Sequence, residues 1–130
     1  MMLNNENYVD EAENAIKALL QMKTKDGREI KILTTSKIRN LLALTSDIYN
    51  EVSALDSEKL NEEQIGKVQY LKIRTIYEAG RDQAVKNFVK TAKIIEYIDE
   101  IKGKKSNFIL FSRYMEALVA YRKYLGGKDE

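Results

Sequence analysis

Hydrophobic residues recur along this chain at the spacing of an α-helix, and no convincing stretch alternates in the manner of a β-strand. The first pattern runs from about Asn5 to Met22, and its hydrophobic face consists of Val9, Ala12, Ile16 and Leu19. A polar connection that contains a glycine follows over residues 23–31. This part of the chain therefore predicts an amphipathic helix and then a loop.

A second helix is expected to begin at Thr34 or Thr35, because a threonine hydroxyl can accept a hydrogen bond from a free N–H group of the first helical turn. One continuous stripe then follows, consisting of Ile38, Leu41, Leu42, Thr45, Ile48, Tyr49 and Val52. The next connection lies within the acidic stretch from Ser46 to Glu63, which contains six acids and one lysine. At the end of that stretch, Asn61 and Gln64 have the spacing of a capping box, which predicts the start of the next helix.

Helical spacing continues from the capping box to about Ile101, and Gly80 interrupts it. A glycine at such a point either caps a helix or permits close packing within one continuous helix. We interpret this region as two helices, over about 60–79 and 82–101.

The segment GKKSN then ends the pattern, and a last helix is expected over about 106–125, before Gly126 and Gly127. No internal repeat or change of composition marks a domain boundary. The sequence therefore predicts a single all-α domain, residues 1–130, folded as a compact bundle of about five helices.

Composition narrows the chemistry that this domain can perform. The chain has no histidine and no cysteine, so disulfides, thiolate nucleophiles and histidine-based catalysis or metal binding are excluded. Neither a GxxxxGK[ST] nor a GxGxxG loop is present. No catalytic activity, metal, cofactor or small-molecule substrate is expected. The absence of a signal peptide or an apolar span of about 20 residues predicts a cytoplasmic protein with no membrane partner.

Charge is distributed unevenly along a chain whose net charge is only +2. From Lys102 to Lys128 there are seven basic residues, and Glu116 is the single acid among them. Such a segment suits a phosphate backbone, but it equally suits the last amphipathic helix of a bundle with lysines for solubility.

The predicted helix over 82–101 carries a second basic feature. Its core face consists of Ala84, Phe88, Ala92, Ile95 and Ile98, whereas the opposite side presents Lys86, Lys90, Lys93 and Tyr97. A row of like charges repels itself along a helix unless an anionic partner offsets it. The alternatives are a phosphate-binding row and a solvated lysine face.

Two further helix faces have unusual compositions. Lys67, Arg74 and Arg81 would form another basic row beside Tyr70 and Tyr77 if the helix were continuous through the glycine. The last helix is apolar on two sides. Its main face consists of Phe108, Phe111, Met115, Leu118 and Val119, and its back consists of Ile109, Arg113, Ala117, Ala120 and Tyr124. Either it is the central helix of the bundle, or its back contacts a partner.

Four strings stand in order along most of the chain: NNENYVDEAENAI, LTTSKIRNLL, YEAGRDQAVK and RYMEALVAYRKYLGGKD. In sequence and spacing they resemble the small helical subunit of the type III-A CRISPR–Cas Csm effector complex. The resemblance implies a non-catalytic protein of antiviral defence that works inside a ribonucleoprotein. Its implied partners are other Csm subunits, copies of itself stacked as a minor filament, the CRISPR RNA and the target RNA. Contacts to the RNA backbone would be independent of base sequence.

Basic residues within or next to these strings are the candidate nucleic-acid-binding residues: Lys37, Arg39, Arg81, Lys86, Lys90, Lys93, Arg113, Arg122, Lys123 and Lys128. Lys90 and Lys93 lie just beyond the third string, so their candidacy depends on the helical row. Arg113 lies on the back of a crowded helix and could instead pair with Glu78 or another buried acid.

A purely structural role within the complex is the alternative to RNA binding. In that case the acidic stretch from Ser46 to Glu63 would contact the basic C-terminal end of the next copy. A helix-turn-helix DNA-binding protein is less consistent with the sequence, because no short turn precedes a helix with a polar, base-reading face.

Overall fold

The computed structural model describes residues 3–126, and over that part of the chain it consists of six α-helices and no β-strand. The helices are α1 (Tyr8–Gln21), α2 (Thr35–Val52), α3 (Glu62–Arg81), α4 (Gln83–Thr91), α5 (Ile94–Asp99) and α6 (Lys105–Tyr124). The predicted all-α class is confirmed. The count is one higher than expected because the predicted helix over 82–101 is divided into α4 and α5.

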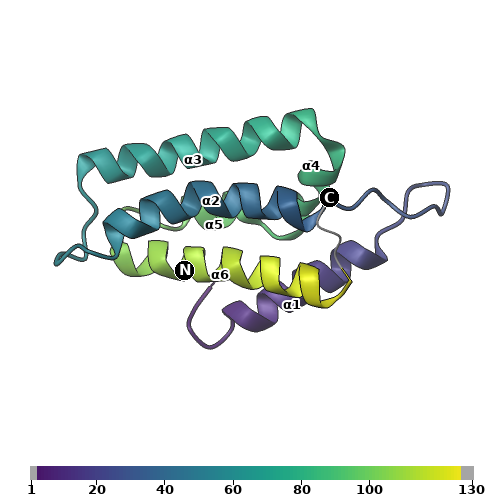
Figure 1. Cartoon of the computed structure of the whole chain (residues 1–130), viewed down its shortest axis with the longest axis horizontal. Helices are drawn as coiled ribbons and strands as arrows, with labels where there is room; N and C mark the ends of the chain where they lie inside the picture. The colour runs from purple at the N-terminus through teal and green to yellow at the C-terminus, as the bar shows by residue number, and fades with distance from the viewer. Residues whose placement is uncertain (1–2, 127–130) are drawn as a thin grey trace.

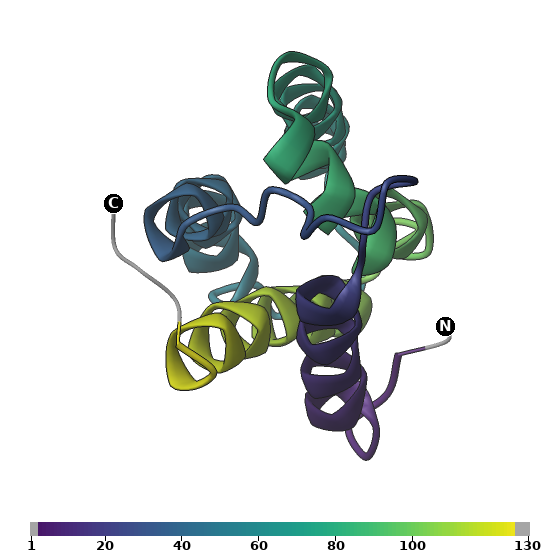
Figure 2. The same ribbon diagram turned by 90° about the vertical axis from the view of Figure 1, so that its right-hand side faces the viewer.

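The helices form a bundle around one hydrophobic cluster. α3 lies along one side and α1 with α6 along the opposite side, with α2 and α5 between them (Figures 1 and 2). α6 packs against α1, α2 and α5 and buries Phe108, Phe111, Tyr114, Met115 and Leu118. Its central position accounts for its main apolar face. Within the described residues, no helix combines the length and hydrophobicity that crossing a membrane requires.

Both predicted N-terminal caps are present. The Thr34 hydroxyl accepts a hydrogen bond from the backbone N–H of Lys37, so Thr34 rather than Thr35 is the N-cap of α2. Asn61 and Gln64 form the complete capping box of α3, each side chain accepting from the other residue's backbone N–H at 2.8 and 3.0 Å. These caps were predictable because they depend on residues three positions apart.

The predicted division of this region into two helices near Gly80 is confirmed, but Gly80 itself does not end the first of them. α3 continues through Gly80 to Arg81, and the chain bends at Asp82 instead. Asp82 has an extended backbone, and its side chain accepts a hydrogen bond from the N–H of Ala84 at 3.0 Å, so it caps α4. The polar cap, not the glycine, determines the boundary.

The prediction of one continuous helix over 82–101 was wrong. The chain leaves the helical path at Lys93, which has a left-handed backbone (φ 56°, ψ 40°). After this turn Ile94, Tyr97 and Ile98 are buried, and Ile95 is only half-buried. Tyr97 therefore does not line an exposed row with the lysines; its ring packs edge-on against Tyr114 with centroids 5.1 Å apart.

Two smaller expectations about buried faces need adjustment. Val9 is 41% exposed, and Ala15 takes a place in the hydrophobic face of α1 instead. In α2, Leu42 and Tyr49 are half-buried at the edge of a stripe whose other members are buried.

Candidate nucleic-acid interface

Most of the predicted binding residues lie at one end of the molecule. α2 begins there, α3 and α6 end there, and α4 lies beside them together with the connection between α1 and α2 (Figures 1 and 2). We call this the basic end and define it by six residues: Lys37, Arg39, Arg81, Lys86, Lys90 and Lys123. Because these residues come from four different helices, only the fold brings them together.

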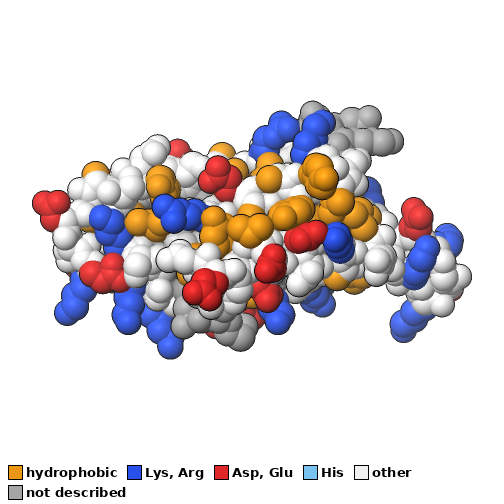
Figure 3. All heavy atoms as spheres, turned by 90° about the horizontal axis from the view of Figure 1, so that it is seen from below, with side chains coloured by type: hydrophobic (Ala, Val, Ile, Leu, Met, Phe, Trp, Pro, Cys, Tyr) orange, Lys and Arg blue, Asp and Glu red, His pale blue; other side chains and the backbone are white. Residues whose placement is uncertain are grey.

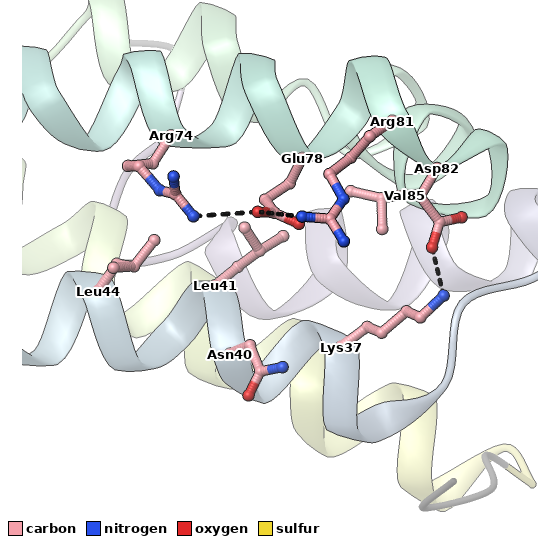
Figure 4. A pocket seen from close by; sticks show the side chains of 9 residues that line it. All are labelled: Lys37, Asn40, Leu41, Leu44, Arg74, Glu78, Arg81, Asp82 and Val85. Carbon is pink, nitrogen blue, oxygen red and sulfur yellow. Dashed lines mark hydrogen bonds and ion pairs between the residues drawn. The ribbon is translucent and has the colours of Figure 1, made fainter.

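A groove of about 460 Å³ between α2 and the α3–α4 corner forms part of the basic end (Figure 4). Three cationic side chains line it, Lys37, Arg74 and Arg81, together with the acids Glu78 and Asp82. The groove therefore carries three positive and two negative formal charges.

Ion pairs hold most of these charges in place. The Lys37 ammonium pairs with Asp82, and the Arg74 guanidinium donates to Glu78 at 3.1 Å. Arg81 is less constrained, because its shortest distance to Glu78 is 3.9 Å and its side chain is 62% exposed. With five N–H donors and one weak ion pair, Arg81 is the groove residue best placed to bind an additional anion.

Arg74 and Arg81 also make cation–π contacts. Both guanidinium groups lie over the ring of Tyr77, at 5.3 and 5.7 Å from its centroid. The hydrogen bond from Lys37 is the main cause that lowers the pKa of Asp82 below its ordinary value, so this carboxyl stays ionised. The basic row expected on α3 is thus partly realised, since α3 is continuous, but two of its members already contact Glu78.

Lys86 and Lys90 lie on the outer side of α4, where both are exposed. Their spacing of four residues places them on one face of the helix. Lys93 is exposed too, but it lies in the turn after α4 and not on the same helical row. The predicted three-lysine row is therefore reduced to a pair on α4.

The remaining candidates have different surroundings. Arg122 is buried, and its Nε donates to the carbonyl oxygen of Leu33 at 3.0 Å, with burial lowering the pKa of the guanidinium. Arg113 is exposed on α6 away from the basic end and does not contact Glu78, which accepts from Arg74 instead. Lys128 lies outside the described residues.

Some nearby cations were not among the candidate binding residues. Arg74, noted from the sequence only as part of a basic row, joins the groove through the contact of α2 with α3. Lys23, Lys25, Arg28 and Lys31 belong to the connection beside the basic end. The sequence predicted only a polar loop there, although its four basic residues outnumber its two acids, Asp26 and Glu29. Within the described residues, no group of three or more acidic side chains is arranged to hold a metal ion.

The fold and this surface define a small all-α protein with a cationic end. The family model for Csm2 of type III-A matches residues 13–128. A Streptococcus thermophilus protein described as "CRISPR system Cms protein Csm2" is 45% identical over 98% of both chains. The protein of that description from Mycobacterium tuberculosis is 41% identical over the full length of both, and one from Enterococcus italicus is 39% identical over 71% of this chain and 67% of its own.

The chain therefore belongs to the Csm2 family of type III-A CRISPR systems. Membership of this family confirms the resemblance seen in the four sequence strings. It makes the protein a small subunit of a type III-A Csm complex, whose other subunits are its partners.

Proposed function

We propose that this protein is a non-catalytic subunit that contacts the backbone of guide and target RNA inside the Csm complex, with several copies stacked side by side. The observation that carries the proposal is the basic end, where cations from four helices converge. Lys86, Lys90 and Arg81 are its main contacts, because all three side chains are exposed.

The chemistry of these side chains favours phosphate over base recognition. Lysine and arginine on the outside of helices present charge without a pocket that would hold a base. In a complex whose guide RNA pairs with the target, base pairing already supplies the sequence specificity. Few contacts per copy give weak binding, which becomes strong when copies are linked along one RNA.

The test compares two double variants in the assembled complex. Lys86→Ala with Lys90→Ala should weaken RNA binding equally for all sequences and reduce the salt slope by about 1.5, since each lost phosphate contact contributes about 0.7–0.9. The matched control is Lys59→Ala with Lys104→Ala, which removes the same charge at the opposite end of the bundle. There the backbones of the two residues pair in an antiparallel manner. Equal loss in both variants would contradict the proposal, because net charge alone would then explain the effect.

A purely structural role is the second candidate, and the ion pairs of the groove support it, since they already satisfy Lys37 and Arg74. The acidic stretch suggested for this role has internal partners as well: Glu51 pairs with Lys67, and Glu58 accepts from Ser106. Cross-linking distinguishes the two functions. Lysine–RNA cross-links at Lys86 or Lys90 support RNA contact, whereas cross-links to carboxylates alone support the structural role.

A further inference from the structure

Glu78 lies between two arginines of its own helix. Arg74 precedes it by four residues and Arg81 follows it by three, so the three side chains share one face of α3. The Arg74 guanidinium donates to the Glu78 Oε1 at 3.1 Å, and a nitrogen of Arg81 lies 3.9 Å from the same oxygen. Figure 4 shows the carboxylate between the two guanidinium groups in the groove between α2 and α3. One carboxylate oxygen therefore serves two cations.

An aromatic ring helps to position both guanidinium groups. Each of them lies over the ring of Tyr77, at 5.3 Å for Arg74 and 5.7 Å for Arg81. A guanidinium that stacks on a ring keeps its N–H donors at the edges of its plane, where an acceptor can reach them. The two arginines are thus arranged for one shared anionic acceptor.

The Glu78 carboxylate is a poor match for this pair of arginines. At 3.9 Å from Arg81 its oxygen is beyond hydrogen-bonding distance, so it satisfies only Arg74. A phosphate group spreads its charge over several strong acceptor oxygens and can accept from two guanidinium groups at once. The groove of about 460 Å³ has room for such a group, and the Arg81 side chain is 62% exposed at its edge.

We propose that Arg74 and Arg81 form a binding site for one phosphate group, and that the Glu78 carboxylate occupies this site until a phosphate displaces it. This inference rests on the proposed function where the phosphate belongs to RNA, and it adds an internal competitor to that function. Asp82 does not have this role, because its carboxylate caps α4 and pairs with Lys37.

The opposite side of the bundle has a different character. Figure 3 shows the side of α1 and α6, where hydrophobic side chains form a band with acidic side chains beside it. On this side Arg113 shares a shallow hollow with Glu116, whereas three cations line the groove between α2 and α3. A phosphate is therefore attracted to the groove and not to the hollow.

An internal competitor lowers the affinity of a single copy for phosphate. The Glu78 carboxylate cancels part of the positive charge of the two arginines, and an incoming anion must move it aside against like-charge repulsion. Stray RNA should therefore bind poorly to one copy. Linked copies that hold the same RNA compensate through a high effective concentration of phosphate.

The experiment measures the affinity of the full chain for a short oligouridine, with and without the charge of Glu78. Glu78→Gln keeps the size of the side chain and should raise the affinity about three- to tenfold, as expected when a partly screened like charge is removed at close range. Thermal unfolding checks that the variant folds.

The matched control is Glu63→Gln on the same helix. It removes one charge from an ion pair of the same spacing, because Glu63 lies 3.6 Å from Lys67. This control should change the affinity less than about twofold, since such exposed pairs interact weakly. Equal gains in Glu78→Gln and Glu63→Gln would overturn the proposal, because net charge alone would then explain them.

A further set of variants tests whether the gain depends on the two arginines. Arg74→Ala with Arg81→Ala removes the site. Adding Glu78→Gln to this double variant should raise the affinity no more than Glu63→Gln does. A full gain that persists without the arginines would overturn the proposal, because Glu78 would then act on other cations.

Inorganic phosphate distinguishes a free phosphate from the phosphate of RNA. The probe is the NMR signals of the Arg74 and Arg81 side-chain N–H groups, recorded in Glu78→Gln during titration with inorganic phosphate or with oligouridine. Saturable shifts with inorganic phosphate would support a site for free phosphate, and shifts with oligouridine alone would support a site for the RNA backbone. Signals that move with neither ligand would overturn the proposal.

The RNA contact of the proposed function is measured separately, through cross-linking at Lys86 and Lys90 in the assembled complex. Phosphate-dependent shifts without such cross-links would reject the proposed RNA contact and leave this inference in place. Cross-links combined with an unchanged affinity of Glu78→Gln would do the opposite.

Discussion

At the residue scale, burial distinguishes cations that hold the fold from cations that face solvent. Arg122 and Lys123 are adjacent in the sequence, yet Arg122 is buried against the Leu33 carbonyl and Lys123 is exposed. The sequence placed both in one basic tail, because composition and helical spacing do not reveal which neighbour a long side chain meets. Knowledge of the contact between the end of α6 and the segment before α2 was required.

Tyr114 is a second buried polar residue with a specific partner, and it allows a prediction about alkaline stability. Its hydroxyl donates to the carbonyl oxygen of Ala92 at 2.8 Å, next to the turn between α4 and α5, and burial raises its pKa well above the ordinary value. Tyr114→Phe should lower the free energy of unfolding by about 1–2 kcal/mol at neutral pH, because the Ala92 carbonyl loses its donor. Chemical denaturation measures this.

The sign of the pH effect follows from the raised pKa. The stabilising contribution of a neutral buried tyrosine is complete below its unfolded pKa of about 10 and declines as the pH rises above it. The difference between the wild type and Tyr114→Phe should therefore shrink above about pH 10. A constant difference from neutral to alkaline pH would show that the hydroxyl is not buried in this way.

At the scale of elements, local signals predicted where helices begin better than where they end. Thr34 and the pair Asn61–Gln64 determine starts through contacts three residues apart, and both starts were predicted. The turn at Lys93 contains neither glycine nor proline and exists because it allows Ile94 and Tyr97 to reach the core. Such a break depends on the tertiary structure, so periodicity alone continued the helix through it.

Asp82 connects three elements and so makes the element scale testable. It ends α3, caps α4 through the N–H of Ala84, and pairs with Lys37 of α2. Asp82→Ala should cost about 0.5–2 kcal/mol of stability through the lost cap. Asp82→Asn should cost less, because the amide oxygen can still cap the helix. Denaturant titration at pH 7 compares the two variants.

The acid dependence of the same variants checks the ion pair. Because Lys37 lowers the pKa of Asp82, the stability from this pair is present above the unfolded value of about 3.9 and is lost as the pH falls through the lower, folded value. The wild type and Asp82→Asn should therefore converge in stability at acidic pH. An unchanged gap in acid would indicate that the cap, and not the charge, accounts for the difference.

At the scale of the whole molecule, the separation of surfaces is the feature with functional weight. A chain of net charge +2 would bind RNA weakly if its charges were evenly spread, but the bundle collects cations at one end. The exposed hydrophobic residues of α3 (Tyr70, Ile73, Ile76 and Tyr77) belong to a helix along one long side of the bundle instead. The sequence revealed the two apolar sides of α6 and the basic rows, but their relative placement required the fold.

The basic end also predicts how binding depends on RNA length. If copies stack along one RNA as proposed, the affinity of the isolated protein should rise steeply with RNA length, because each added copy gains a neighbour as well as phosphate contacts. Lys86→Ala with Lys90→Ala removes phosphate contacts only, so the affinity should fall at every length and the salt slope per bound copy should be smaller. Binding to a series of RNA lengths at two salt concentrations measures both quantities, and Lys59→Ala with Lys104→Ala controls for the lost charge. An affinity that rises only in proportion to the number of sites would contradict stacking along the RNA.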